Sequence, residues 1–235
     1  MKILEINPNT SESMTAHLAR ELMQLKAAET ELTVVNPEHG PVSIESAYDE
    51  ALAIPPTLAL IKQAEQDGYD AAVIACFSDP GLHAARELVS IPVIGIQEAT
   101  LHVAAQLGFR FTITTTFPKR VPAKIEAVKA NGLEAKLASV RPLNMTVLEM
   151  DRDPECTKAR LIEACQAAAS EDGAEVVILG CAGLAGYAAD VEAVTGMKVL
   201  DPSPIALKTA EMLVSLGLKH SKRGLFAQPP VKLIK

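Results

Sequence analysis

The sequence lacks the cysteine and glycine patterns of several common kinds of site. It contains four cysteines in 235 residues, but no C-x-x-C pair and no cluster of cysteine and histidine at zinc-binding spacing. It also contains neither a dinucleotide-binding glycine fingerprint nor a Walker motif. We therefore expect free thiols in a reducing compartment and no dedicated site for a metal ion or a nucleotide.

Long basic blocks and long apolar runs are missing as well. The formal net charge is −7, which argues against nucleic acid or an anionic membrane as the main partner. The N-terminal stretch MKILEINPNT has few apolar residues and is interrupted by Glu5, so it predicts neither a secretory signal nor a membrane span. We expect a cytoplasmic protein that binds a small molecule.

The residues that are present favour an α/β fold. Hydrophobic residues make up 49% of the chain, and short β-rich runs alternate with segments of helical period, which is typical of parallel strands joined by crossover helices. The run KILEIN is followed by the turn cluster NPNTS and then by an apolar helix face from Met14 to Leu25. A second helix is predicted directly after Cys76, with Asp79 as its N-cap and Pro80 at its first position.

The chain also repeats its own architecture. With a shift of about 105 residues, YDAAVIACFSDPG aligns with AEVVILGCAGLAG, and IPVIGIQEATLHVAAQLG aligns with MKVLDPSPIALKTAEMLVSLG. Upstream, KILEINPNTS pairs with RFTITTTFPK. The repeat predicts two pseudo-symmetric domains, each a mainly parallel sheet flanked by helices, with a ligand cleft between them at the carboxyl ends of their strands.

Cys76 and Cys181 occupy matching positions of this repeat, each at the end of an apolar run and before small residues. We expect the two thiols to face each other across the cleft. Two such groups suit racemisation of a carbon acid, because a thiolate on one face can remove a proton while a thiol on the other face returns one. An unperturbed thiol is only about 3% ionised at pH 7, so we expect amides at nearby helix starts to lower the thiol pKa. The alternative is that each cysteine is a small packed residue.

Polar side chains lie at corresponding corners of the two halves. The repeat places Asn7 opposite the run Thr114, Thr115 and Thr116. These groups could hydrogen-bond a polar ring or a carboxylate. Alternatively, the threonines are β-branched residues of a strand, and Asn7 stabilises its own turn.

Six motifs in register carry a resemblance to a known family. They are INPNTS at 6–11, GPVSIES at 40–46, ACFSDPGL at 75–82, PVIGIQEA at 92–99, TITTT at 112–116 and ILGCAGL at 178–184. With these motifs the chain resembles the hydantoin and allantoin racemase group of the aspartate/glutamate racemase superfamily. The resemblance implies a first domain of residues 1–97 plus 207–235, to which the last helix returns, and a second domain of residues 98–206.

The resemblance also implies a function and a set of site residues. Cys76 and Cys181 would be the two proton-transfer residues, and no metal, pyridoxal phosphate or other cofactor would be needed. The substrate would be a 5-monosubstituted hydantoin, whose C5 proton lies between a carbonyl and a ring nitrogen, and the relatives imply a homo-oligomer. The predicted substrate-binding residues are Asn7, Ser43, Phe77, Ser78, Thr114, Thr115, Thr116, Ala182 and Gly183.

Several alternatives stay open. Allantoin is itself a 5-substituted hydantoin, so an allantoin racemase would share these motifs. Amino-acid racemases and maleate isomerases of the superfamily also use two cysteines, whereas arylmalonate decarboxylases use one. A non-catalytic small-molecule binder has no need of two facing thiols, and a redox pair would need its sulfurs within bonding distance. The C-terminal segment KHSKRGLFAQPPVKLIK could pack on the first domain, lie at a subunit interface or be a mobile tail.

Overall fold

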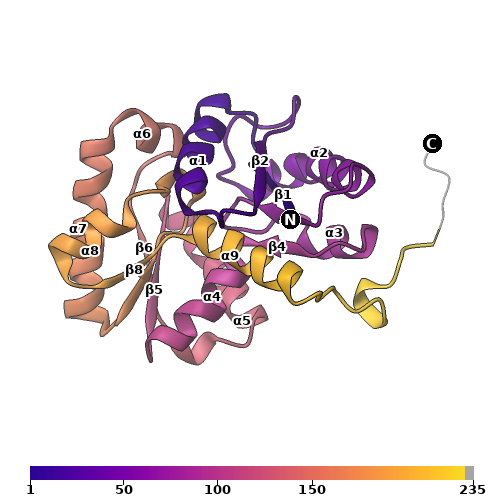
Figure 1. Cartoon of the computed structure of the whole chain (residues 1–235). Coiled ribbons are helices and arrows are strands. Elements are labelled where there is room, and N and C mark those ends of the chain that lie inside the picture. Colours follow the sequence, from indigo (N-terminus) through magenta and orange to yellow (C-terminus); the bar gives the residue numbers. More distant parts are fainter. Residues whose placement is uncertain (231–235) are drawn as a thin grey trace.

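The computed structural model describes residues 1–230 and confirms the two-domain α/β prediction. Within this range, eight strands form two four-stranded sheets in which every strand pair is parallel (Figure 1). The sheets have the orders β2-β1-β3-β4 and β6-β5-β7-β8, so the same topology occurs twice. The strands are β1 Lys2–Ile6, β2 Glu31–Val35, β3 Ala71–Ile74, β4 Val93–Gly95, β5 Phe111–Thr115, β6 Leu137–Pro142, β7 Val176–Ile178 and β8 Lys198–Leu200.

Helices connect the strands and flank both sheets (Figure 1). None of the helices within residues 1–230 is long and apolar enough to cross a membrane. The α-helices are α1 Glu12–Leu25, α2 Ala47–Gln66, α3 Leu82–Leu88, α4 Ile96–Leu107, α5 Val121–Ala130, α6 Val147–Arg152, α7 Pro154–Asp172, α8 Ala188–Thr195 and α9 Pro202–Ser215. Short 3-10 helices are η1 Pro118–Arg120, η2 Glu134–Lys136, η3 Ala182–Leu184 and η4 Gly224–Phe226.

The first helix shows how the local sequence sets an element. Ser11 is the N-cap of α1, and its hydroxyl accepts a hydrogen bond from the backbone N–H of Met14 at 3.4 Å. Met14 is buried, whereas Leu25 is 46% exposed. The predicted apolar face therefore stops before Leu25, because the helix ends at that residue.

The two halves share one hydrophobic core. A single cluster of buried side chains includes Ile3 and Val73 of the first sheet, Ile113 and Ile178 of the second, and Leu207 of α9. Helix α9 follows β8 of the second sheet and packs against α4, β3 and β4, so it bridges the halves (Figure 1). Burial of apolar surface, worth roughly 25 cal/mol per Å², thus holds the halves in a fixed arrangement. The predicted boundaries at 97 and 207 fall inside α4 and α9 and stay predictions.

The segment after α9 packs against the first half. The Lys222 ammonium donates to the backbone carbonyls of Arg86 and Val89 at the end of α3, where a cation satisfies free helix carbonyls. The ring of Phe226 lies 5.7 Å from that of His83, centroid to centroid. Of the three predicted arrangements, packing on the first domain is therefore the one observed up to Phe226. Residues 231–235 of this segment lie outside the described residues.

Asp79 caps a helix, but not the helix that was predicted. Helix α3 begins at Leu82, and its N-cap, Gly81, makes no side-chain hydrogen bond. The Asp79 carboxylate instead accepts hydrogen bonds from the backbone N–H groups of Gln97 (2.9 Å) and Glu98 (2.8 Å) at the start of α4. The prediction was wrong because Asp79 has a left-handed backbone, with φ of 47°, and this turn directs its side chain to the β4–α4 junction.

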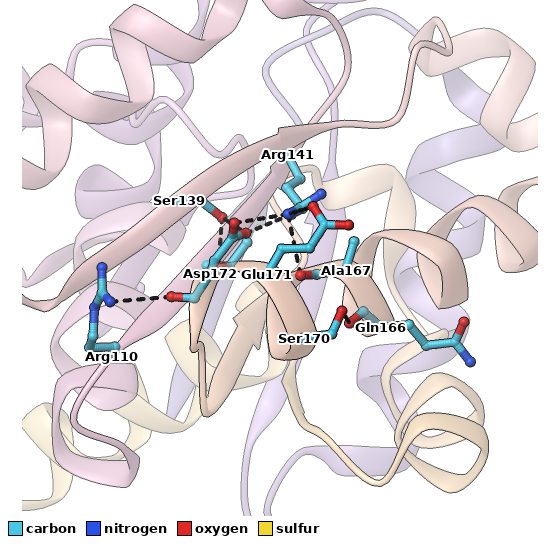
Figure 2. Close-up of polar contacts among 9 residues, drawn as sticks. Arg110, Ser139, Arg141, Gln166, Ala167, Ser170, Glu171 and Asp172 are labelled. Atoms are coloured by element: carbon cyan, nitrogen blue, oxygen red, sulfur yellow. Dashed lines mark hydrogen bonds and ion pairs between the residues drawn. The ribbon is translucent and has the colours of Figure 1, made fainter.

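A polar cluster holds α7 against β6, the edge strand of the second sheet (Figure 2). Arg141 of β6 donates to Asp172 at 2.6 Å and to Glu171 at 2.7 Å, both at the C-terminal end of α7. Ser139 also donates to Asp172. Hydrogen bonds from Arg141 lower the pKa of Asp172, so this carboxylate stays charged and the edge strand stays tied to its helix.

Candidate active site

Cys76 and Cys181 line one cavity between the two halves. Strand β3 ends at Ile74 and strand β7 ends at Ile178, so each thiol follows the third strand of its own half. Both thiols are free and half-buried. The cavity has an empty volume of about 520 Å³, including its opening to solvent. Both thiols are therefore part of the wall of the same cavity.

Most of the other predicted site residues line the same cavity, namely Asn7, Phe77, Ser78, Thr115, Thr116, Ala182 and Gly183. Ser43 and Thr114 are not part of the lining. The Thr114 hydroxyl accepts a hydrogen bond from the backbone N–H of Gly180 (3.1 Å) and donates to the carbonyl of Ile178 (3.4 Å), so it joins β5 to the end of β7. Ser43 lies in a bend before α2, and its neighbour Ile44 lines the cavity in its place.

Part of the cavity wall was not predicted from the sequence, namely Asn9, Met14, Ile44, Glu50, Arg120, Lys124 and Val147. Apart from Asn9, which lies three residues after β1, these residues do not follow directly on the end of a strand. The sequence did contain a signal for Lys124, because it lies four residues before Val128 on the buried face of α5. A lysine on a buried helix face is rare unless it is paired.

Burial raises the pKa of Cys76 above its ordinary value. A contact between the sulfur and the Ser78 hydroxyl at 3.4 Å and the positive charge of Lys124 act in the opposite direction, while Glu50 adds to the increase. Removal of the thiolate from water outweighs the groups that would stabilise it. The helix start expected next to this thiol lies farther on, since α3 begins at Leu82.

Burial also raises the pKa of Cys181, to about 11. The backbone N–H of Gly183 donates a hydrogen bond that opposes the increase, as expected for the loop after this cysteine, and the charges of Cys76 and Lys124 act on it as well. The expected net direction is therefore wrong for both thiols, because burial raises each pKa and outweighs the Gly183 amide at Cys181. Near pH 7 both cysteines are mainly thiols.

Lys124 connects α5 of the second half to the loop that carries Cys76. Its side chain is buried, and the ammonium donates a hydrogen bond to the backbone carbonyl of Phe77. The same nitrogen lies 5.0 Å from the centroid of the Phe77 ring. Gln97 also donates to the Phe77 carbonyl, at 3.0 Å. Burial lowers the pKa of Lys124, and the negative charge of a Cys76 thiolate would raise it.

Two further polar contacts join the halves around the cavity. Arg120 of η1 forms an ion pair with Glu50 of α2. The Glu45 carboxylate accepts a hydrogen bond from the backbone N–H of Val147 at 2.8 Å. In the described part of the chain, no group of three or more His, Cys, Asp and Glu side chains is arranged to hold a metal ion.

Asn7 serves its own loop as well as the cavity wall. Its side-chain amide donates hydrogen bonds to Asn9 Oδ1 at 2.9 Å and to Thr15 Oγ1 at 3.0 Å. Its donors are therefore used within the β1–α1 connection and the first turn of α1, which supports the turn-stabilising alternative. A ligand role for Asn7 stays a prediction.

Asp79 fixes the end of the loop that carries Cys76. A Cβ atom on Gly95 would lie 2.2 Å from Asp79 Cγ, so only glycine leaves room for the carboxylate over the start of α4. Burial raises the pKa of Asp79 to about 7, against the hydrogen bonds from Gln97 and Glu98. The contact of Asp79 with the start of α4 thus positions the loop between β3 and α3, which carries Cys76.

Comparison with known proteins finds relatives along the whole chain. The family model for Asp/Glu/hydantoin racemase matches residues 3–210. A hydantoin racemase of Rhizobium meliloti is 41% identical over 232 residues, which cover 99% of this chain and 96% of the relative. A hydantoin racemase of Pseudomonas sp. (strain NS671) is 40% identical, with 99% and 93% of the two chains covered. The structure of allantoin racemase from Klebsiella pneumoniae superposes with a TM-score of 0.96 at 36% identity, covering 100% and 96%.

These similarities confirm the resemblance that the six motifs carried. The matched range includes both cysteines and every residue named above in the cavity wall. The named relatives are racemases, and racemases are isomerases. The chain is therefore a member of the Asp/Glu/hydantoin racemase family and an isomerase.

Proposed function

We propose that the protein interconverts the enantiomers of 5-monosubstituted hydantoins by proton transfer at C5 between two cysteines. One observation carries the proposal: Cys76 and Cys181 lie in the wall of one cavity, each after the third strand of its own sheet. Hydantoin racemases that are 41% and 40% identical support the substrate class. A non-catalytic binder would have no use for a thiol on each side of its ligand.

The proposed reaction needs one thiolate and one thiol. The thiolate removes the C5 proton, and the electron pair of the C–H bond moves into the ring as an enolate. The other cysteine then donates its proton to the opposite face of C5, so that the configuration inverts and this second cysteine becomes the thiolate. Protons and charge balance without another reactant. For the reverse reaction the two cysteines exchange roles.

The enolate oxygen requires hydrogen-bond donors aimed at the ring. Thr115, Thr116, Ala182 and Gly183 line the cavity and carry hydroxyl and backbone N–H groups, although the N–H of Gly183 already donates to Cys181. Short donors on both sides of the cavity suit a flat ring with two carbonyl groups. We infer that these residues bind the ring, while the cysteines act on C5.

Allantoin is a second candidate substrate, because it is a hydantoin ring with a ureido group at C5. Allantoin racemases from Klebsiella pneumoniae and Pseudomonas fluorescens superpose on this chain with TM-scores of 0.96 and 0.95. The ion pair of Arg120 and Glu50 in the cavity wall offers partners for the polar ureido group. Apolar side chains at Met14, Ile44 and Val147 suit an aliphatic substituent.

The proposal is tested by the decay of optical rotation with separate L and D enantiomers of several 5-substituted hydantoins, allantoin, aspartate and glutamate. We expect decay for the hydantoin rings, allantoin included, and none for the free amino acids. Racemisation of aspartate or glutamate without any hydantoin would contradict the proposed substrate class. The ratio of rates between allantoin and aliphatic hydantoins decides between the two candidates.

A further inference from the structure

The two halves contribute different residues to the cavity from equivalent helices. Helices α1 and α5 each follow the first strand of their sheet. Helix α1 contributes the apolar Met14 to the cavity wall, whereas α5 contributes Lys124. The cavity therefore contains a duplicated thiol but a single copy of this lysine.

The charge of Lys124 is not neutralised by a local ion pair. Among the described residues, no carboxylate lies within ion-pair distance of Lys124, whereas the other cation of the cavity, Arg120, pairs with Glu50. The hydrogen-bond acceptor of Lys124 is the neutral carbonyl of Phe77. Since Gln97 donates to the same carbonyl, that carbonyl would keep a donor without the lysine.

Other charged groups also face the two thiols. The Glu50 and Asp79 carboxylates act on Cys76, and Glu45 acts on Cys181. Glu50 is paired with Arg120, and the Asp79 carboxylate accepts two backbone N–H groups of α4. Glu45 accepts a backbone N–H group of α6. Each carboxylate is thus engaged elsewhere, and Lys124 is left as the cation that acts on both thiols.

The proposed reaction moves one negative charge from one wall of the cavity to the other in each turnover. A cation beside only one sulfur would hold the charge there and slow its return. A cation within reach of both sulfurs stabilises the thiolate on either side, and it does so strongly in a cavity shielded from water.

We propose that the Lys124 ammonium is the shared counter-ion of the two cysteines, stabilising whichever of them is the thiolate. This inference rests on the proposed two-cysteine function. Lys124 lines the cavity with both sulfurs, is buried, lacks a carboxylate partner among the described residues and reaches from one half to the loop of the other. It is a positioning residue for charge, and it takes no proton from the substrate.

The test compares Lys124→Met with Lys129→Met, since Lys129 lies on the same helix but is exposed. The rate at which iodoacetamide alkylates each cysteine is measured by peptide mass spectrometry between about pH 6 and about pH 10, because only the thiolate reacts. In Lys124→Met we expect both rates at about pH 8 to fall by roughly tenfold or more, since one pKa unit changes the thiolate fraction tenfold. Lys124→Arg should keep most of the rate, and Lys129→Met should match the parent protein.

The same variants separate an electrostatic role from a structural one. Replacement of a buried charge by an apolar side chain of similar length should leave Tm unchanged or raise it. Unchanged alkylation in Lys124→Met, or a change at only one cysteine, overturns the proposal. If Lys124→Met does not fold, Lys124→Gln gives the same readout, because it keeps a donor for Phe77 without the charge.

Failure of this inference can be told apart from failure of the proposed function. Alkylation needs no substrate, whereas optical rotation reports racemisation. If Lys124→Met slows alkylation of both cysteines but the parent protein racemises no hydantoin, the counter-ion role of Lys124 stands and the proposed function is wrong. If the parent protein racemises hydantoins but alkylation is unchanged in Lys124→Met, the proposed function stands and the counter-ion role is wrong.

Discussion

Cys76 and Cys181 are mainly protonated near pH 7, because burial raises the pKa of each thiol. The thiolate that the proposed reaction requires is therefore a minor species, and its fraction rises about tenfold for each pH unit below the pKa. We expect kcat/KM for racemisation to rise between about pH 7 and about pH 9, as measured from initial rates of optical rotation. A profile that is flat or falls over this range would contradict a thiolate base.

Substitution of either cysteine separates the two proton transfers. Cys76→Ser and Cys181→Ser should each lower racemisation by on the order of 10²–10⁴-fold or more, because a serine hydroxyl is a far weaker acid than a thiol. Each variant should still exchange the C5 proton of one enantiomer with deuterated water, followed by NMR. Cys156→Ser is the matched control, since Cys156 is exposed on α7. Racemisation close to the parent rate in either site variant rules out the two-thiol scheme.

Glu5 of β1 is fully buried, and neither carboxylate oxygen has a hydrogen-bond partner among the described residues. Burial raises its pKa well above the ordinary value, and the nearby Asp201 adds to the increase. The folded chain thus holds the Glu5 proton more tightly than the unfolded chain. Between the unfolded pKa, near about 4.3, and the folded pKa, the free energy of unfolding falls as pH rises.

Glu5→Leu should therefore stabilise the protein most at alkaline pH. We expect the free energy of unfolding to rise by about 1–3 kcal/mol at pH near 8, with a smaller gain near pH 5, as measured by urea denaturation at both pH values. Glu5→Gln serves as the comparison, because it removes the titration but keeps a polar group. A loss of stability of equal size at both pH values would show that the carboxyl group is not the source of the cost.

At the scale of elements, the start of α4 depends on a residue from a different connection. Asp79→Ala removes the carboxylate that accepts the N–H groups of Gln97 and Glu98, and should lower the free energy of unfolding by about 1–2 kcal/mol. Asp79→Asn should cost less, because asparagine keeps an acceptor and tolerates the left-handed backbone at this position. Urea denaturation checks the order, and equal losses in both variants would argue against the cap.

The same helix shows which elements the sequence could predict. The strands and the cap at Ser11 follow from local patterns, since apolar runs and turn residues lie next to each other in the chain. The partner of Asp79 could not be predicted, because it depends on how β3 and β4 align through a crossover connection, which pairs Ile74 with Gly95. Local rules assigned the cap to the nearest helix.

The residues of the candidate site likewise include some that the sequence could predict and some that it could not. Cys76 and Cys181 could be located because ligands of parallel sheets bind at the carboxyl ends of strands. Lys124 and Glu50 lie on helices, and their place in the cavity depends on how the halves pack. The direction of the thiol pKa shifts was wrong for the same reason, since burial is a property of the assembled cavity and outweighs a nearby amide.

At the scale of the whole molecule, the shared core fixes the two halves relative to each other, so that Cys76 and Cys181 belong to a single cavity. A bound hydantoin should therefore slow alkylation of Cys76 and Cys181 together, by roughly tenfold or more once the ligand is well above its Kd. Cys156, exposed on α7, should react at the same rate with and without ligand. Protection of only one of the two cysteines, or of neither, would mean that they do not face the same bound molecule.

The duplicated topology gives the cavity two similar walls, but the lysine of α5 has no counterpart on α1. In the proposed reaction the two halves of the catalytic cycle would therefore have unequal barriers, although the overall equilibrium between mirror-image compounds stays at unity. Deuterium at C5 should slow the left-handed and right-handed substrates by different factors.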